Sequence, residues 1–395
     1  MMMTQIQHPH LLGNYGRAPI TFVRGEGVWL IDDRKERYLD CVAGIAVCAL
    51  GHAHPSIAQA IATQAATLVH CSNLYHHEPA GTLATRLATL SGFQRVFFCN
   101  SGTESNEAAI KLARKLAHRR GQTDRTVILA CSNSFHGRTL GALAATDNKA
   151  YHEGFGPLPQ DFAFTPFNDV AALEKAIDER TAAVIIEPIQ GESGIVPATK
   201  EFLQTARRLC DERGALLIFD EIQCGMGRLG TLFAFEHFGV RPDVATLAKA
   251  LANGLPIGAL LIDGSAADAW RPGDHGTTFG GSPVPCAAAL AHLHVREQTD
   301  LDSHVKRVGA RLLEALRLLA RERSDLFEEP RGIGLMLGLP VRAPHEAKTI
   351  VSAALDRRLL LNAAGRNTLR FVPPLIISET EVDEAMLRLR RTLED

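Results

Sequence analysis

Three charged residues follow apolar runs of the sequence and have side chains able to do chemistry in a buried site. Asp220 and Glu221 end the run ALLIFDE, and a buried carboxylate is costly unless it meets a cation, such as the protonated nitrogen of a heterocycle. Lys249 is the single charged residue between Asp243 and Asp263. Apolar surroundings lower the pKa of a lysine, which makes it nucleophilic enough to form a Schiff base. The alternatives are a carboxylate that caps a helix or pairs with an arginine, and a lysine whose ammonium reaches solvent.

A turn between a predicted strand and a predicted helix is a candidate anion site. Ser101, Gly102 and Thr103 follow the run RVFFCN and precede the helical pattern ESNEAAIKLARK. Glycine lets a ligand approach the backbone, and a helix start offers unpaired N–H groups and the positive end of its dipole, so phosphate is the expected ligand. The competing interpretation is an ordinary helix cap, with Glu104 or Glu107 in the first turn.

Two arginines are candidates for binding carboxylate groups of a substrate. In SFHGRT, Phe135 is placed to lie flat on an aromatic ligand while Arg138 holds a carboxylate through two hydrogen bonds. Arg370, in TLRFVPPL, is the second candidate, and Glu192 of PIQGESG is a possible partner for it. A core phenylalanine, solvent-facing arginines and a solvated loop carboxylate are the alternatives.

Together these features indicate one ligand, pyridoxal phosphate. It needs an anion site, a carboxylate for a protonated ring nitrogen, an aromatic side chain for a ring face and a lysine for an aldehyde. A nicotinamide dehydrogenase is the rival, because residues 225–230 satisfy the pattern G-x-G-x-x-G. However, the acidic pair at 220–221 would repel a pyrophosphate there, and the following TLFAFEHFG is too short and aromatic for the required helix.

The elements that must position these residues read as strands and helices in alternation. Seven apolar runs lack a polar–apolar alternation, which is typical of strands buried on both faces. They span residues 95–100, 126–131, 162–167, 182–189, 215–221, 244–248 and 258–263. Helical patterns lie between several of them, at 104–121, 169–180 and 200–214. We expect an α/β fold whose large domain has a mostly parallel, seven-stranded sheet covered by helices, with the ligand at the carboxyl ends of the strands.

The two ends of the chain have a different pattern. Residues 17–40 predict an antiparallel meander with turns at GEG and DDRK, and a long amphipathic helix begins after about residue 300, before further strands and helices. These ends predict a smaller α/β domain. The predicted boundaries are 1–54 for its N-terminal part, 55–298 for the large domain and 299–395 for its C-terminal part.

Composition and charge exclude several classes of protein. Of 395 residues 46% are hydrophobic and the formal net charge is −2, so we expect neither a disordered chain nor a partner such as nucleic acid or a membrane surface. The N-terminus lacks a signal-peptide pattern, and no run reaches the ~18 apolar residues of a membrane span. The eight cysteines form no C-x-x-C pair and the histidines form no H-E-x-x-H motif, so no metal is expected. The predicted location is the cytoplasm.

Several long segments resemble the class-III aminotransferases of fold type I, over essentially the whole chain. These segments are GEGVWLIDD, ALGHAHP, NSGTESNEAAIKLAR, FHGRT, EPIQGE, FDEIQCGMGR, LAKALANGLPIGA and GTTFGG. The resemblance implies pyridoxal 5′-phosphate as cofactor, with Lys249 and Asp220 as catalytic residues and Gln223 on the ring hydroxyl. The full set of implied cofactor-binding residues is Ser101, Gly102, Thr103, Phe135, Asp220, Glu221, Ile222, Gln223, Lys249 and Thr278. Because Thr278 would reach the phosphate in a neighbouring subunit, the resemblance also implies a homodimer with active sites at the interface.

Within the family, SNLYHHEPAGTLATRL and the arginine of FHGRT are most similar to the acetylornithine branch. This implies transamination of N2-acetyl-L-ornithine with 2-oxoglutarate, giving N-acetyl-L-glutamate 5-semialdehyde and L-glutamate, a step of arginine biosynthesis. The alternatives are other ω-aminotransferases, acting on succinylornithine, 4-aminobutyrate, ornithine or N-succinyl-diaminopimelate.

The same resemblance assigns residues to the substrates. Arg138 would hold the carboxylate of N-acetylornithine with Thr277 nearby, and Tyr15 matches a tyrosine on the substrate side. Arg370 would bind the α-carboxylate of 2-oxoglutarate or glutamate, and Glu192 would shield it while the ω-amino substrate is bound. Ornithine aminotransferases have a tyrosine for the free α-amino group where this chain has an isoleucine, at position 45, which favours an acylated substrate.

Overall fold

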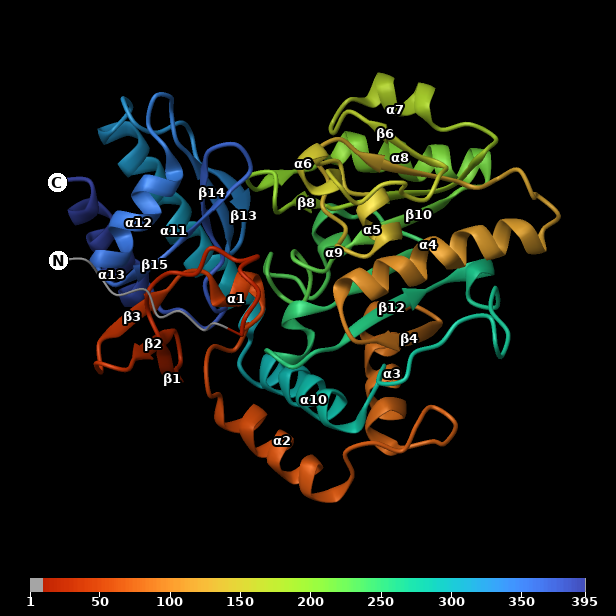
Figure 1. Cartoon of the computed structure of the whole chain (residues 1–395), viewed down its shortest axis with the longest axis horizontal. Coiled ribbons are helices and arrows are strands. Elements are labelled where there is room, and N and C mark those ends of the chain that lie inside the picture. The colour runs from red at the N-terminus through yellow and green to blue at the C-terminus, as the bar shows by residue number, and fades with distance from the viewer. Residues whose placement is uncertain (1–9, 395) are drawn as a thin grey trace.

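The computed structural model describes residues 10–394, and a seven-stranded sheet runs through the larger part of the molecule, at the right in Figure 1. Its strands are β4 (Arg95–Cys99), β5 (Val127–Cys131), β6 (Phe162–Thr165), β7 (Thr181–Ile186), β10 (Leu216–Asp220), β11 (Val244–Leu247) and β12 (Gly258–Ile262). The order in the sheet is β4-β12-β11-β10-β7-β5-β6, and β12 alone runs antiparallel to its neighbours. The predicted mostly parallel sheet is confirmed, strand by strand.

Consecutive residues of a central strand face two different layers of helices. In β10, Leu217 and Phe219 pack in a core that includes α8 (Lys200–Arg213). Ile218, between them, packs in a second core under α4 (Gly102–Arg119). Both faces of the strand are therefore apolar, and this is why the sequence shows no alternation.

The predicted helices are confirmed, and their ends follow local sequence. The Ser101 hydroxyl accepts the backbone N–H of Glu104 at 3.3 Å, which starts α4, and α8 ends at Gly214 with a φ of 67°. The helix α7 (Val170–Ala176) is shorter than the predicted 169–180, because Ile177 is already extended.

Shorter elements complete the part of the chain around this sheet. They are α2 (Pro55–Thr67), α3 (Glu78–Ser91), α5 (Leu140–Ala144), α6 (Lys149–His152), α9 (Ala234–Phe238), α10 (Pro283–Gln298), β8 (Ile189–Gln190), β9 (Val196–Pro197), and the 3-10 helices η1 (Lys249–Ala252) and η2 (Gly264–Ala266). Within residues 10–394, no helix combines the length and the apolar character needed to cross a membrane.

The two ends of the chain meet in one small sheet, to the left of the large one in Figure 1. The predicted meander is confirmed as β1 (Phe22–Glu26), β2 (Trp29–Asp32) and β3 (Arg37–Asp40), and β3 pairs with β15 (Leu359–Leu360). A second small sheet has the order β13 (Arg331–Ile333), β14 (Met336–Pro340), β17 (Thr368–Phe371), β16 (Asn362–Ala364). The accompanying helices are α1 (Ala43–Ala46), α11 (Leu301–Glu322), α12 (Ala347–Asp356) and α13 (Glu379–Thr392). The domain boundaries at 54 and 298 stay predictions.

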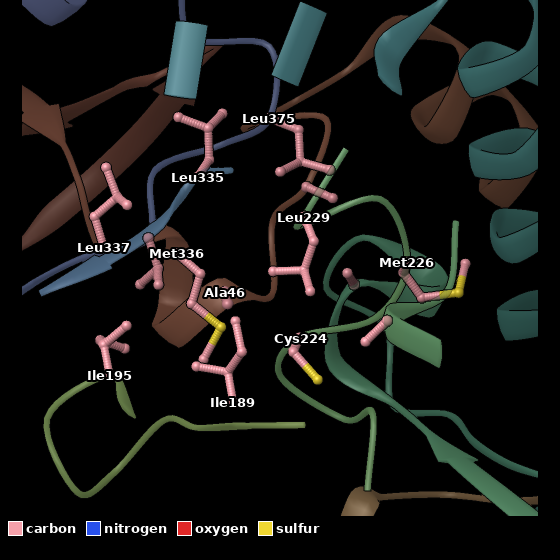
Figure 2. Close-up of a cluster of buried hydrophobic side chains, with 14 of the residues drawn as sticks. Ala46, Ile189, Ile195, Cys224, Met226, Leu229, Leu335, Met336, Leu337 and Leu375 are labelled. Atoms are coloured by element: carbon pink, nitrogen blue, oxygen red, sulfur yellow. The ribbon is translucent and has the colours of Figure 1, made fainter. Parts of the chain in front are cut away.

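A cluster of buried apolar side chains joins the two parts of the molecule. Figure 2 shows Met336 of β14 beside Ile189 of β8 and Ala46 of α1, with Cys224 and Leu229 of the loop after β10 close by. These residues come from both ends and from the middle of the sequence. The chain segments that follow β7 and β10 are thus anchored on the C-terminal sheet.

Candidate active site

A cavity of about 360 Å³ lies at the carboxyl ends of the sheet strands. Its walls come from the segments that follow β4, β5, β7, β10 and β11, as expected for a ligand site of a parallel sheet. Nine residues predicted from the sequence line it, namely Ser101, Gly102, Thr103, Phe135, Arg138, Asp220, Ile222, Gln223 and Lys249.

Lys249 lies directly after β11 and begins η1. Its φ of 43° is in the left-handed region, which side-chain-bearing residues seldom adopt and which is a form of strain often found at functional sites. Its ammonium forms no ion pair or hydrogen bond with any residue that the structure describes. Burial lowers the pKa of this ammonium below its ordinary value, although the carboxylate of Glu192 opposes the shift. The cavity therefore contains an amine without a partner, which is more readily neutral than a surface lysine.

Asp220 ends β10 and presents its carboxylate to the same cavity. Its Oδ2 accepts hydrogen bonds from Asn106 Nδ2 and His136 Nδ1, both at 2.8 Å, and its Oδ1 accepts the N–H of Ile222 at 3.1 Å. Burial disfavours the charged imidazole, but the hydrogen bond to Asp220 and the negative charges of Asp220 and Glu187 together outweigh it and raise the pKa of His136. This set of donors stabilises a negative carboxylate at the cavity wall, where a protonated ring nitrogen would meet it.

The start of α4 also lines the cavity. It is both an ordinary helix cap and a candidate anion site, the two interpretations that the sequence allows. Ser101 caps the helix, yet Gly102 and Thr103 still line the cavity. A Cβ at Gly102 would lie 2.8 Å from Cδ1 of Ile222, so a side chain here would displace Ile222 from the cavity wall. The Thr103 hydroxyl accepts the N–H groups of Arg138 and Thr139, at 3.1 and 3.3 Å. The helix start is thereby joined to the segment after β5.

Arg138 lies at the exposed side of the cavity, next to Phe135. Its guanidinium carbon is 5.5 Å from the centre of the Phe135 ring and 3.6 Å from the centre of the Tyr151 ring. Among the residues that the structure describes, no carboxylate pairs with this guanidinium. Its charge is available to a ligand.

Arg370 lies on β17 and is almost completely buried next to the cavity residue Gln223. Its Nη1 donates to Glu192 Oε1 at 2.5 Å and to Gln223 Oε1 at 3.2 Å, and its Nε donates to Asn362. Burial acts to raise the pKa of Glu192, but the guanidinium of Arg370 reverses this and holds it below its ordinary range. The predicted pair of Arg370 and Glu192 is present in the structure.

Glu221 lies elsewhere than the resemblance implied. Its carboxylate accepts the N–H groups of Ala234 and Phe235, at 2.6 and 2.8 Å, at the start of α9, and it does not line the cavity. Burial raises its pKa to about 8. Neighbouring residues at a strand end point to opposite sides, so only Asp220 of this pair faces the cavity.

Three further predicted residues lie outside the cavity wall. Thr277 is the nearest, because its hydroxyl accepts a hydrogen bond from Asn100 Nδ2 at 3.0 Å, and Asn100 lines the cavity. Thr278 lines a separate small pocket beside His77. Tyr15 is 68% exposed, and the one ring contact found for it is with the guanidinium of Arg17. Among residues 10–394, neither Thr278 nor Tyr15 lines the cavity.

Sequence reasoning missed Glu187, which lines the cavity at the end of β7. Its Oε2 accepts the N–H of Phe135 at 3.0 Å and its Oε1 accepts the N–H of Gly191 at 3.3 Å. Burial raises its pKa to about 7, against the opposing effect of His136. The signal was available, since Glu187 follows a buried apolar run just as Asp220 does.

The glycine-rich stretch at 225–230 contains no dinucleotide site. A Cβ at Gly225 would lie 2.7 Å from the backbone oxygen of Glu221, and one at Gly230 would lie 2.5 Å from Cγ of Lys306. These glycines allow close packing within the protein. The next helix, α9, has five residues and begins only at Ala234, so the pattern does not itself open a helix as the rival function requires.

Comparisons with known proteins agree with this geometry. The sequence pattern of the family described as "Aminotransferase class-III" matches residues 13–393. The chain is 47% identical to the acetylornithine aminotransferase of Methanocaldococcus jannaschii, over 93% of this chain and 92% of that protein. Its structure is similar to the N-acetylornithine aminotransferase of Stenotrophomonas maltophilia K279a, with a TM-score of 0.85, 39% identity, and coverage of 96% and 97%. It is also similar to an ornithine aminotransferase of Toxoplasma gondii described with PLP at its active site, with a TM-score of 0.93, 32% identity, and coverage of 97% and 92%.

Proposed function

Since the chain belongs to the class-III aminotransferase family, we propose that it transfers the terminal amino group of N2-acetyl-L-ornithine to 2-oxoglutarate. The products are N-acetyl-L-glutamate 5-semialdehyde and L-glutamate, and the cofactor is pyridoxal 5′-phosphate. Relatives named acetylornithine aminotransferase match nearly the whole chain at 46–48% identity, which supports this substrate. The observation that carries the proposal is the joint placement of an unpaired lysine, a hydrogen-bonded aspartate and a helix N-terminus around one cavity.

The residues of this cavity match the groups of the cofactor one by one. The N–H groups at Gly102 and Thr103 bind the phosphate, since a helix start attracts an anion. Phe135 would cover one face of the ring, and Gln223 would bind the ring hydroxyl, since both side chains line the cavity. Asp220, whose carboxylate Asn106 and His136 hold at the cavity wall, would accept a hydrogen bond from the protonated ring nitrogen. When bound, pyridoxal phosphate supplies a ring that accepts electrons from the substrate carbon.

Lys249 acts as both the attachment point and the acid–base group. Its lowered pKa lets Nζ be neutral when the substrate amine arrives, so it can take the proton from the carbon that bears the amine. The same Nζ would then give that proton back, so Lys249 serves first as the base and then as the acid. The second half-reaction runs in the reverse sense with 2-oxoglutarate, so the kinetics are ping-pong.

The two arginines divide the recognition of the substrates. Arg138 binds the carboxylate of N-acetylornithine, near Thr277. Arg370 binds the α-carboxylate of 2-oxoglutarate after the carboxylate of Glu192 has moved off its guanidinium. Ile45, which has no hydrogen-bonding group, favours an acylated α-nitrogen over a free ammonium. We propose Tyr15 as a further contact on the substrate side of the site.

We propose further that the protein works in the cytoplasm as a homodimer, in which Thr278 contacts the phosphate of the neighbouring subunit's cofactor. Apolar side chains close to Thr278 in sequence or space are exposed in the single chain, including Phe279 at 62% and Tyr75 at 70%. Asn73 Nδ2 donates to the backbone oxygens of Thr277 and Gly280, at 3.0 and 3.1 Å, so the two exposed segments form one surface. A second copy of this chain would bury these exposed apolar side chains, and this burial favours a homodimer.

The test is a single-turnover panel on the purified protein loaded with pyridoxal phosphate. We expect its visible absorption band to be lost faster with N-acetylornithine than with succinylornithine, ornithine or 4-aminobutyrate, and restored by 2-oxoglutarate. A preference for ornithine, the substrate in the name of the Toxoplasma relative, would overturn the assignment of substrate. Lys249→Ala should abolish both the band and turnover, and an active yellow variant would overturn the assignment of the lysine.

A further inference from the structure

The guanidinium of Arg138 is held by aromatic rings instead of by carboxylates. Its central carbon lies 3.6 Å from the centre of the Tyr151 ring, closer than any other arginine of the described chain lies to an aromatic ring. Phe135 contributes a second, longer contact at 5.5 Å. A ring face attracts a cation but leaves the N–H groups at the edge of the guanidinium free for hydrogen bonds.

Tyr151 contacts both residues proposed to face the ligand. Its ring meets that of Phe135 edge to face, with centroids 6.2 Å apart and an angle of 85°. The aromatic pair and Arg138 thus form one group at the exposed side of the cavity, and of the three only Tyr151 does not line it.

The position of Tyr151 is itself fixed by its short helix. In α6, the side chain of Asn148 accepts the N–H of Ala150 at 3.1 Å, which starts the turn. His152 Nε2 lies 3.0 Å from the backbone oxygen of Leu143 and 2.7 Å from that of Thr146, so the following residue anchors α6 on α5. The ring of Tyr151 is therefore presented from a supported element.

We propose that Tyr151 is a positioning residue for substrate recognition, which holds the Arg138 guanidinium ready for the distal carboxylate of the amino donor. The inference rests on the proposed function and extends it, because it assigns the orientation of Arg138 to a residue outside the cavity wall. An arginine paired with an acid would have to exchange that partner for each substrate. An arginine stacked on a ring keeps its place and offers its hydrogen bonds unchanged.

The experiment compares two amino donors in single-turnover reactions of the cofactor-loaded protein. N-acetylornithine carries the carboxylate, and 1-pentylamine has a similar chain without it. Tyr151→Leu removes the ring face, and we expect the second-order constant for N-acetylornithine to fall about three- to fivefold, the size of an exposed cation–π contact. The constant for 1-pentylamine should stay within about twofold of the wild-type value, since that amine does not use Arg138.

Two further variants separate positioning from a general structural effect. Tyr151→Phe keeps the ring and should behave as the wild type, because the contact uses the ring face and not the hydroxyl. In an Arg138→Ala background, Tyr151→Leu should cause no additional loss with N-acetylornithine. An equal loss with both amines, or full additivity of Arg138→Ala and Tyr151→Leu, would overturn the inference. If the wild-type protein ignored N-acetylornithine altogether, the proposed function would fail instead.

Discussion

The two arginines proposed to bind carboxylates stand in opposite surroundings. Arg370 is 1% exposed, and its guanidinium already donates hydrogen bonds to Glu192, Gln223 and Asn362. Arg138 is exposed, and its guanidinium touches only aromatic rings among the described residues.

This difference follows from the cost of burying charge. A guanidinium at the depth of Arg370 needs an anion in the folded chain, so Glu192 is part of the structure whenever no substrate carboxylate replaces it. Arg138 keeps contact with water and needs no such partner. Under the proposed function, Arg370 would be an exchangeable site, whose anion is replaced by substrate, and Arg138 a permanent site, whose guanidinium stays open to substrate. This difference suits an enzyme whose two substrates bind alternately in one cavity.

The largest expected effect comes from removing the buried arginine. Arg370→Ala leaves Glu192 without its cation, and we expect a loss of about 3 kcal/mol in the free energy of unfolding, measured by urea denaturation. The second-order constant for 2-oxoglutarate should also fall by about 100-fold, because one charged carboxylate contact is lost.

The matched control is Arg138→Ala. It should reverse the pattern, with little change in the urea midpoint and the main loss in the reaction of N-acetylornithine. Equal losses of stability in the two variants would remove the contrast between a buried and an exposed site.

Glu187 connects the two arginine regions and gives a prediction about pH. It accepts the N–H of Phe135 on the side of Arg138 and the N–H of Gly191 on the side of Arg370. Burial raises its pKa to about 7 from an ordinary 4.5, so between these values the folded chain binds more protons than the unfolded chain. Its contribution to stability is therefore complete at acid pH and is lost as the pH rises through 7.

We expect the stability of the wild type, measured relative to Glu187→Gln, to fall by about 2 kcal/mol between pH 5 and pH 8. Denaturant titrations at the two pH values provide the measurement. Glu212→Gln, at an exposed position whose ion pair within residues 10–394 is with Arg208 alone, serves as the control and should show no such difference. A gap between wild type and Glu187→Gln that did not depend on pH would contradict the shifted pKa.

A smaller effect is expected when the exchangeable site loses its own anion. Glu192→Gln keeps the shape of the side chain but no longer competes for Arg370, so the second-order constant for L-glutamate should rise by about five- to tenfold. The constant for N-acetylornithine should change less than this. The ratio of the two constants, from single-turnover absorption, is the quantity to follow, and an unchanged ratio would mean that Glu192 does not compete with substrate.

The smallest effect concerns the backbone segment that carries Arg138, the permanent site. The Thr139 hydroxyl donates to Glu107 at 2.6 Å, and the Thr103 hydroxyl, 3.0 Å from that of Thr139, accepts the N–H of Arg138. Thr139→Val breaks this chain of hydrogen bonds, and we expect the constant for N-acetylornithine to fall about twofold to fivefold, with Thr139→Ser close to the wild type. A matching loss with 1-pentylamine would show that the change acts on the whole site.

Much of the site could be predicted because strand ends are visible in sequence. Lys249 and Asp220 were conspicuous as charges at the ends of buried strands, and a parallel sheet brings such ends together. The resemblance implies a cofactor-binding role for Glu221, but its carboxylate lies at the start of α9, because the twofold period of a strand turns it away from Asp220. Glu187 was passed over, although it carries the same signal.

Other features had no signal in the sequence. Tyr151 lies in the four-residue helix α6 between β5 and β6, which is too short for a hydrophobic period to indicate which residue Tyr151 will contact. The stacking on Arg138 arises from how α6 sits on α5, which is a tertiary result. The partners of Thr278 belong to an assembly that a single chain does not contain.

The left-handed backbone at Lys249 has a consequence for how this protein can be improved. A lysine at this position has a strained backbone, with a positive φ, and a buried ammonium that has lost its hydration. Each of these costs the folded state about 1 kcal/mol or more. Lys249→Gly would relieve both at once, so heat tolerance should rise as turnover vanishes. A screen that selects only for thermal resistance would enrich stable variants that have lost activity. Selection for activity therefore has to accompany it.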